Sequence, residues 1–315
     1  MQLDIIPLQS THLEDAARLA CRRYKDLRKQ VPLLPSRYGE IDTLLPRLCE
    51  ILDEGPAVAA LEGNQLVGFM AAWQMASFRG RRATYSPEWA NGALLAQSDR
   101  IYEAMYTYLS RIWVADSCGM HLVGSLVNDR TAVANWPWMG FGMIAADAVR
   151  DLSPLPEPDT PNMEIRRAGI EDLEAFMDLE GALARCLAEA PTFLLDAAPD
   201  TIAQVSALFE DGKKVIWLAI EGDRPVAYLL IGPASQGAAA IIFDEGTCSI
   251  TGAYTRPSAR GRGIGRALLN QALSWARAEG YTRCAVDFEP MNPPARRFWL
   301  SSFTPVCYTF ARTIS

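Results

Sequence analysis

The sequence predicts an α/β (α+β) protein built from two tandem domains of similar layout. Three observations support this. The chain has 315 residues, and single domains commonly hold about 100–150. Strand, helix and hairpin patterns open both halves in the same order. A segment with four prolines, 154–163, reads as a linker, so we expect domains at 1–153 and 164–315.

The first half alternates between strand and helix patterns. A Gly63-Asn64 pair marks a hairpin turn, and Ser10 or Thr11 can cap the first helix. In chain order we expect a strand at 3–8, a helix from Leu13, a hairpin of strands 57–61 and 65–75, an irregular stretch at 78–90, a helix at 100–113, a strand at 122–127, a short helix at 130–139 and a strand at 142–149.

The second half repeats this order, with a hairpin turn at Gly222-Asp223. We expect a strand at 164–167, a helix at 171–189, a hairpin of strands 215–220 and 225–231, strands at 248–255 and 284–288 around a helix from Ile264, and a closing strand at 304–312. Apolar residues recur in the helix from Ile264 with a period near 3.6, and Gly280 is its expected stop.

An arginine- and glycine-rich turn, residues 260–265, joins the strand at 248–255 to the helix from Ile264. Such a turn points free backbone N–H groups at an anion, at the positive end of the helix. A dinucleotide fingerprint is excluded because the sixth position holds Arg266 or Leu268 instead of glycine. A phosphate loop is excluded because no Gly-Lys-Ser/Thr ending is present.

The spacing Arg260-x-x-Gly263-x-Gly265 resembles the pyrophosphate loop of the GCN5-related N-acetyltransferases (GNAT family), R/Q-x-x-G-x-G/A. Upstream, Tyr254-x-x-Pro257 resembles the end of that family's fourth strand. Downstream, Asn292-x-x-Ala295-x-x-Phe298-Trp299 resembles its Asn-x-x-Ala-x-x-Phe-Tyr element. The resemblance implies that each domain is a mixed, mainly antiparallel, twisted sheet flanked by helices.

The resemblance extends to the first half in a degenerate form. Asn128, Ala132 and Gly140-Phe141 look like a worn copy of the later motifs. Residues 94–99 stand where the glycine loop should be, but they contain no glycine and end in the acidic Asp99. We therefore expect that domain 1–153 does not bind the cofactor, and that it covers the second domain or walls its substrate site.

The resemblance implies acetyl-CoA as the donor and CoA as the product. The residues expected to bind the cofactor are Ala253, Tyr254, Thr255, Arg260, Gly261, Arg262, Gly263, Ile264, Gly265, Arg266, Asn292 and Trp299. The amides of residues 261–266 would take the diphosphate, and the strand end would line the pantetheine arm. Arg262 reads equally well as a solvated surface charge, and Asn292 also as a turn former before Pro293.

The implied reaction is direct attack of a neutral amine on the thioester in a ternary complex, which needs a proton acceptor. The candidates are Glu245 and Glu289, although each also reads as an exposed strand-end carboxylate. The family's tyrosine that protonates the thiolate is replaced by Trp299, which cannot act as an acid. Tyr254 or Tyr308 could substitute; otherwise the thiolate leaves unaided, or the enzyme is slow or inactive.

The composition limits which classes of partner and which cellular location are expected. The net charge of −7 comes without a basic block, so nucleic acid is not expected as a partner. Seven scattered cysteines without a C-x-x-C pair predict reduced thiols in the cytoplasm. Two histidines predict no metal site. No stretch reads as a secretion signal or a membrane span, so no membrane partner is expected.

Three functions fit these observations. The first is an N-acetyltransferase acting on a primary amine of a small molecule or a peptide N-terminus. The second is a noncatalytic acetyl-CoA-binding regulator or partner-binding protein, which Trp299 and the degenerate first domain favour. The third is an amine acetylase of the mycothiol synthase type, which the tandem layout permits. A homodimer is compatible with each of the three.

Overall fold

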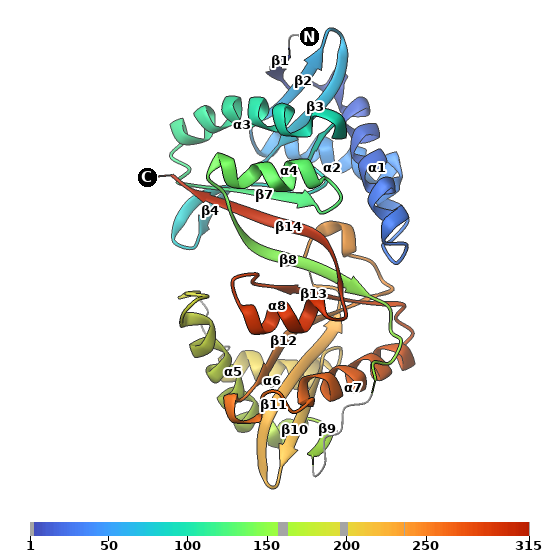
Figure 1. Cartoon of the computed structure of the whole chain (residues 1–315), viewed down its shortest axis with the longest axis vertical. Coiled ribbons are helices and arrows are strands. Elements are labelled where there is room, and N and C mark those ends of the chain that lie inside the picture. The colour runs from blue at the N-terminus through green and yellow to red at the C-terminus, as the bar shows by residue number, and fades with distance from the viewer. Residues whose placement is uncertain (1–2, 157–162, 196–200, 236, 315) are drawn as a thin grey trace. The chain divides into compact units, whose positions relative to one another are not determined.

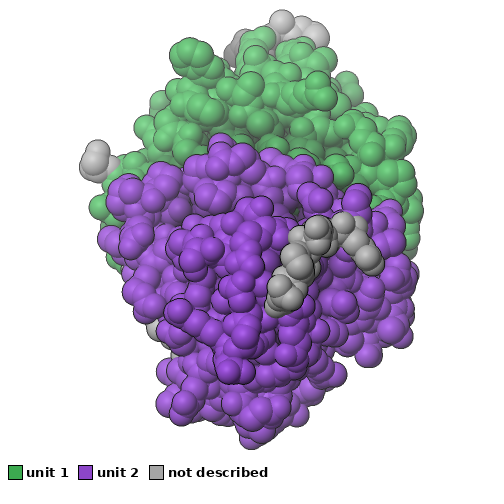
Figure 2. Space-filling model, turned by 60° about the horizontal axis from the view of Figure 1, so that its bottom comes forward, with its two compact units in different colours: residues 1–148, 239–242, 304–315 green, residues 149–238, 243–303 purple. Residues whose placement is uncertain are grey.

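The computed structural model describes residues 3–156, 163–195, 201–235 and 237–314. The chain divides into two compact units, coloured separately in Figure 2. Unit 1 comprises Met1–Ala148, Ala239–Ile242 and Thr304–Ser315, and unit 2 comprises Val149–Ala238 and Phe243–Phe303. Residues 157–162 of the expected linker 154–163 lie outside the described residues. No helix in the described ranges has the length and the apolar character needed to cross a membrane.

Unit 1 contains two sets of strands with helices packed against them (Figure 1). One is an antiparallel sheet in the order β1-β2-β3-β6, and the other has the order β4-β5-β7-β14-β8. Its elements are β1 (Asp4–Pro7), α1 (Leu13–Gln30), α2 (Ile41–Glu54), β2 (Ala57–Glu62), β3 (Gln65–Ala71), β4 (Trp73–Phe78), β5 (Arg81–Ser86), β6 (Asn91–Ala93), α3 (Ser98–Ala115), β7 (Met120–Leu126), α4 (Arg130–Asn135), β8 (Gly142–Arg150, in unit 1 up to Ala148) and β14 (Thr304–Thr313).

Unit 2 is built on the strand order β13-β12-β11-β10-β9. All neighbours are antiparallel except β12 and β13, which run parallel. Its elements are β9 (Met163–Arg167), α5 (Leu173–Ala188), α6 (Ile202–Asp211), β10 (Val215–Glu221), β11 (Arg224–Pro233), β12 (Thr247–Thr255), α7 (Ile264–Ala278), β13 (Arg283–Phe288) and α8 (Pro293–Leu300). The expected mixed, mainly antiparallel α/β architecture is confirmed.

The apolar periodicity expected from Ile264 onward becomes the buried face of α7. Its buried residues are Ile264, Leu268, Leu269, Ala272, Leu273 and Ala276. These side chains recur every three or four residues, so they lie on one side of the helix, which packs against β10, β11 and β12. The helix gives way at Gly280, whose φ of 86° is left-handed and suits a residue without a Cβ.

Three local expectations were wrong. The stretch 78–90, expected to be irregular, contains β5 and the turn that joins it to β4 in a hairpin. Its turn uses Arg79 and Gly80, with φ of 49° and 74°, and arginine is an uncommon residue at positive φ, so the sequence carried a weak turn signal. The helices α2 and α6 were not expected; α2 contains Pro46, which usually argues against a helix interior.

The C-terminal strand β14 was expected to close the second domain, yet it belongs to unit 1. It pairs antiparallel with β7, from Cys307 opposite Leu126 to Thr313 opposite Met120. Phe310 of β14 is buried in the core cluster of unit 1. An alternating pattern establishes that a segment forms a strand, but it does not say which sheet edge the strand joins.

Candidate active site

The strand β12 bends halfway along its length. It pairs with β13 as far as Ile250, whereas its pairing with β11 continues to Thr255. The register with β11 slips at Thr251, so that strand β12 carries one extra residue there. Such a β-bulge bends the strand that contains it. The bulge coincides with the end of the pairing to β13, and it leaves residues 253–255 hydrogen-bonded to β11 as the strands diverge.

The glycine turn between β12 and α7 exposes backbone N–H groups. Gly261 and Gly263 have φ of 77° and 80°, a left-handed backbone that side chains disfavour. Arg266 and Ala267 donate their N–H groups to the carbonyl of Gly263, at 3.0 Å each. Within the described part of the chain, the amides of residues 261–265 donate to no backbone acceptor. The first amides of a helix are orphan donors of this kind, and they attract anions.

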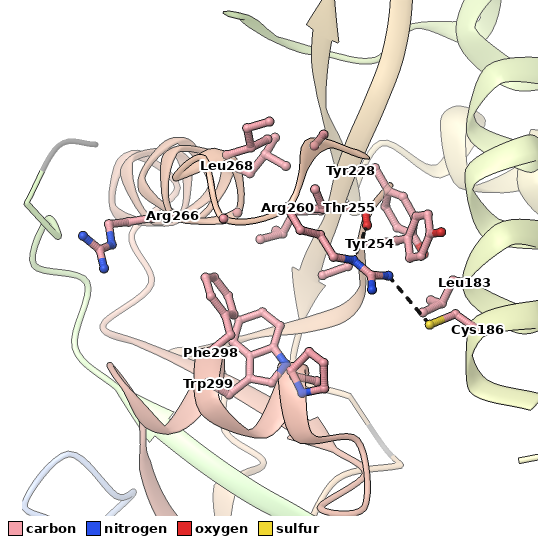
Figure 3. Close-up of a pocket in the computed structure, with 18 of the residues that line it drawn as sticks. Leu183, Cys186, Tyr228, Tyr254, Thr255, Arg260, Arg266, Leu268, Phe298 and Trp299 are labelled. Atoms are coloured by element: carbon pink, nitrogen blue, oxygen red, sulfur yellow. Dashed lines mark hydrogen bonds between the residues drawn. The ribbon is translucent and has the colours of Figure 1, made fainter. Parts of the chain in front are cut away.

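A cavity of about 540 Å³ extends from this turn along the end of β12. Figure 3 shows side chains from α5, β11, β12, α7 and α8 around it. The lining residues are Leu183, Cys186, Tyr228, Leu229, Ala253, Tyr254, Thr255, Ala259, Arg260, Gly261, Gly263, Ile264, Gly265, Arg266, Leu268, Asn292, Pro294, Ala295, Phe298 and Trp299. The structure thus brings eleven of the twelve residues expected to bind the cofactor around one cavity.

Arg260 lies across this cavity (Figure 3). Its Nε donates to the carbonyl of Thr255 at 2.9 Å, and its Nη2 approaches the sulfur of Cys186 at 3.8 Å. Its guanidinium also lies 5.7 Å from the ring centre of Tyr254, a cation–π distance. A permanent positive charge is therefore held between β12 and α5, beside the glycine turn.

Arg262 is the expected cofactor residue that does not line the cavity. Its guanidinium forms an ion pair with Glu221, and both side chains are roughly half exposed. The hydrogen bond from Arg262 lowers the pKa of the Glu221 carboxyl. The structure therefore favours the reading of Arg262 as a surface charge.

The wall opposite β12 comes from α8. Asn292 caps this helix, and its Oδ1 accepts the amide of Ala295 at 3.3 Å. The rings of Phe298 and Trp299 meet edge to face, with centres 4.7 Å apart. A Cβ on Gly265 would lie 3.3 Å from the Phe298 ring, so α7 and α8 pack closely at this glycine.

The four residues expected to carry the chemistry are not gathered at one point. Tyr254 lines the cavity. Glu245 is exposed and lies in the turn before β12, whose first residue, Thr247, is roughly 20 Å along the strand from Ala253 at a rise of about 3.3 Å per residue. Glu289 is partly buried in the turn before Asn292, outside the cavity lining. Tyr308 lies on β14 in unit 1 and packs against the core of that unit.

The sequence analysis missed the contribution of α5 and β11. Leu183 and Cys186 line the cavity from α5, and Tyr228 and Leu229 line it from β11. The only sequence signal for the α5 pair is its spacing of three residues, which puts both side chains on one helix face. Which face meets β12 is decided by tertiary packing. Within the described residues, no group of three or more His, Cys, Asp or Glu side chains could hold a metal ion.

The corresponding place in unit 1, at the start of α3, is filled by polar side chains of the unit itself. Asp129 is 1% exposed, and it accepts hydrogen bonds from the hydroxyl of Ser98 at 2.7 Å and from the amide of Ala132 at 3.0 Å. Arg23, 3% exposed, pairs with the same carboxylate at 3.0 Å. A second bond joins Arg23 to the carbonyl of Asn91 at 3.1 Å. This buried network occupies the space beside α3.

Comparison with known proteins agrees with this geometry. Residues 182–303 match the model of the family described as Acetyltransferase (GNAT) family. A GCN5-related N-acetyltransferase from Sphaerobacter thermophilus has a similar structure, with a TM-score of 0.59 and 14% identity over 99% of this chain and 95% of that one. The GCN5-related glucosamine N-acetyltransferase region of a fungal β-N-acetylglucosaminidase gives 0.54 and 13%, over 98% of this chain and 38% of that one. No curated protein matches the sequence significantly.

Proposed function

We propose that unit 2 moves the acetyl group of acetyl-CoA to a primary amine of a small molecule or a peptide N-terminus. The match of residues 182–303 to the GNAT acetyltransferase family supports this proposal. One observation carries the proposal. The unengaged amides of residues 261–265 stand at one end of a cavity that follows the diverging end of β12. Seven free cysteines accord with a cytoplasmic location.

The residues of this cavity fit the parts of acetyl-CoA. The amides of residues 261–265 and the charge of Arg260 suit the diphosphate. Residues 253–255 offer backbone groups to the amides of the pantetheine arm. Asn292 can bond the arm through its amide nitrogen while its Oδ1 caps α8. The cofactor supplies an activated acetyl thioester, and the chain supplies its position.

Because the thioester is already activated, the protein has to supply only the position of the reactants and the transfer of protons. An amine attacks only as the free base, so a nearby group or water has to accept its proton. Trp299 offers an indole N–H, which donates a hydrogen bond but no proton. Tyr254 is the one expected acid that lines the cavity, and the guanidinium of Arg260 lies over its ring. A thiol with an ordinary pKa of about 8.5 also leaves without help.

Two measurements on the full chain test the proposal. Isothermal titration with acetyl-CoA should give one bound molecule per chain, since the corresponding place in unit 1 is filled by the Arg23–Asp129 pair. Release of CoA thiol should then be followed with a panel of small primary amines and short peptides. Binding without acetylation of any amine would support the noncatalytic reading that Trp299 motivates. Absence of acetyl-CoA binding would remove both readings.

A further inference from the structure

A carboxylate that the sequence analysis did not single out lies beyond the far end of the cavity. Glu180 of α5 accepts a hydrogen bond from the hydroxyl of Tyr228, whose ring is 1% exposed and which lines the cavity. A Cβ on Gly252 would lie 3.2 Å from that hydroxyl and 3.4 Å from Oε1 of Glu180. The carboxylate therefore sits directly over the backbone of β12 at Gly252, beside the bulge at Thr251.

Its place along β12 determines what it can reach. The cavity follows β12 from the glycine turn through Thr255 to Ala253, and Gly252 is the next residue. Glu180 is thus at the opposite end of the cavity from the amides that suit a diphosphate. It also shares a face of α5 with Leu183 and Cys186, since the three are spaced by three residues. A cofactor that binds its diphosphate at the turn and runs along residues 253–255 ends at Glu180.

The described residues that line the cavity include no Asp or Glu, so a carboxylate that accepts a proton has to come from the margin of the cavity, where Glu180 lies. A second carboxylate on this sheet is that of Asp287 on β13, which follows Val286, the last residue paired with β12. Its side chain reaches solvent, but the protein packed around it desolvates the carboxyl and raises its pKa. Asp287 therefore lies on β13, the strand that diverges from β12, whereas Glu180 lies over β12 itself.

We propose that Glu180 is the group that receives the acceptor amine and takes its proton, an assignment that rests on the proposed acetyl transfer. The ammonium gives one proton to the Glu180 carboxylate. The nitrogen lone pair then forms the N–C bond to the acetyl carbon as the C–S bond breaks, with its electron pair left on sulfur. The second proton lost by nitrogen neutralises the thiolate, through Tyr254 or solvent, and Glu180 returns its proton to water. Tyr228 is the positioning residue that holds the carboxylate.

The test compares Glu180→Gln with Asp287→Asn and with Glu174→Gln, an exposed carboxylate on the same helix. The probes are the best alkylamine of the panel and hydroxylamine, which is largely unprotonated at neutral pH. In Glu180→Gln, kcat/KM for the alkylamine should fall about 100-fold and recover partly at high pH, because general base catalysis is typically worth about 10²–10⁴. The rate with hydroxylamine and the affinity for acetyl-CoA should change less than about threefold, as expected for a lost proton acceptor. Tyr228→Phe should cause a smaller loss of the same kind.

The outcomes separate this assignment from the proposed function. Equal rates for Glu180→Gln and the wild type with the alkylamine, or a loss confined to Asp287→Asn, would overturn the role of Glu180 and leave acetyl transfer standing. An equal loss toward both probes would also overturn it, since that result marks a structural effect. A wild type that binds acetyl-CoA and acetylates neither probe nor any amine would overturn the proposed function, and the role of Glu180 with it.

Discussion

The start of α7 in unit 2 and the start of α3 in unit 1 hold the same place in the repeated order of elements, but their surroundings differ. Before α7, two left-handed glycines turn free amides toward a cavity. Before α3, residues 95–97 form a 3-10 turn, and Ser98 is fully buried with its hydroxyl bonded to Asp129. One helix start is open to a ligand, and the other is satisfied internally.

Two pairs of matched positions explain the difference. Arg23 and Leu183 stand at the same position counted from the first residues of α1 and α5. Asp129 caps α4, the short helix that follows β7, and Asn292 caps α8, the short helix that follows β13. Where unit 2 has a leucine and a neutral amide beside its cavity, unit 1 has an arginine and a carboxylate that bond to each other. In unit 1 the place of the cofactor site is therefore closed by the Arg23–Asp129 pair as well as by the loss of the glycines.

The largest expected effect comes from a carboxylate in the open turn. Gly263→Asp should abolish measurable acetyl-CoA binding, because it adds a negative charge and a strained left-handed side chain where the diphosphate is expected. Calorimetric titration measures this, and circular dichroism checks the fold. The matched control is Gly280→Asp at the other end of the same helix, where φ is 86° and a Cβ meets nothing within 4 Å. Retained affinity in Gly263→Asp would refute the site.

The second prediction concerns the buried Arg23–Asp129 pair of unit 1. Asp129→Asn should destabilise unit 1 by about 3–5 kcal/mol, since it leaves the guanidinium of Arg23 buried without its counter-charge. The double variant Arg23→Leu/Asp129→Asn copies the pattern of unit 2 and should recover much of that loss. Denaturant unfolding measures both. A double variant no more stable than Asp129→Asn would show that the pair is not the reason for the loss.

A third prediction uses the one buried histidine. Desolvation lowers the pKa of His121 to about 4, against about 6.5 in an unfolded chain. Between these values the unfolded chain binds a proton that folded unit 1 does not, so stability falls as the pH drops from about 6.5 to 4, by up to about 3 kcal/mol. His121→Gln should remove this part of the slope in denaturant midpoints. Both histidines, at 12 and 121, lie in unit 1, so unit 2 has no such contribution.

Features that depend on residues close together in the sequence could be predicted, and features that join distant residues could not. The glycine turn, the α7 periodicity and the hairpins β2–β3 and β10–β11 are set by neighbours in the chain, and they were found from the sequence. The pairing of β14 with β7 and the position of Glu180 over Gly252 join residues far apart in sequence, where residue types restrict the choices very little. Side-chain direction was also open: Arg260 and Arg262 are two residues apart, and only tertiary partners separate their roles.

The smallest expected effect sharpens that last distinction. Arg260→Ala should weaken acetyl-CoA binding about 10- to 100-fold, because a charged hydrogen-bond donor beside a diphosphate is worth about 1.5–3 kcal/mol. Arg262→Ala should change affinity less than about threefold, since its guanidinium pairs with Glu221 at the surface and lies outside the cavity lining. Glu221→Gln is the matched control: freeing Arg262 from its partner should leave affinity unchanged or slightly higher. Equal losses in the two arginine variants would show that Arg262 leaves Glu221 for the ligand, and the turn would then present two guanidinium groups instead of one.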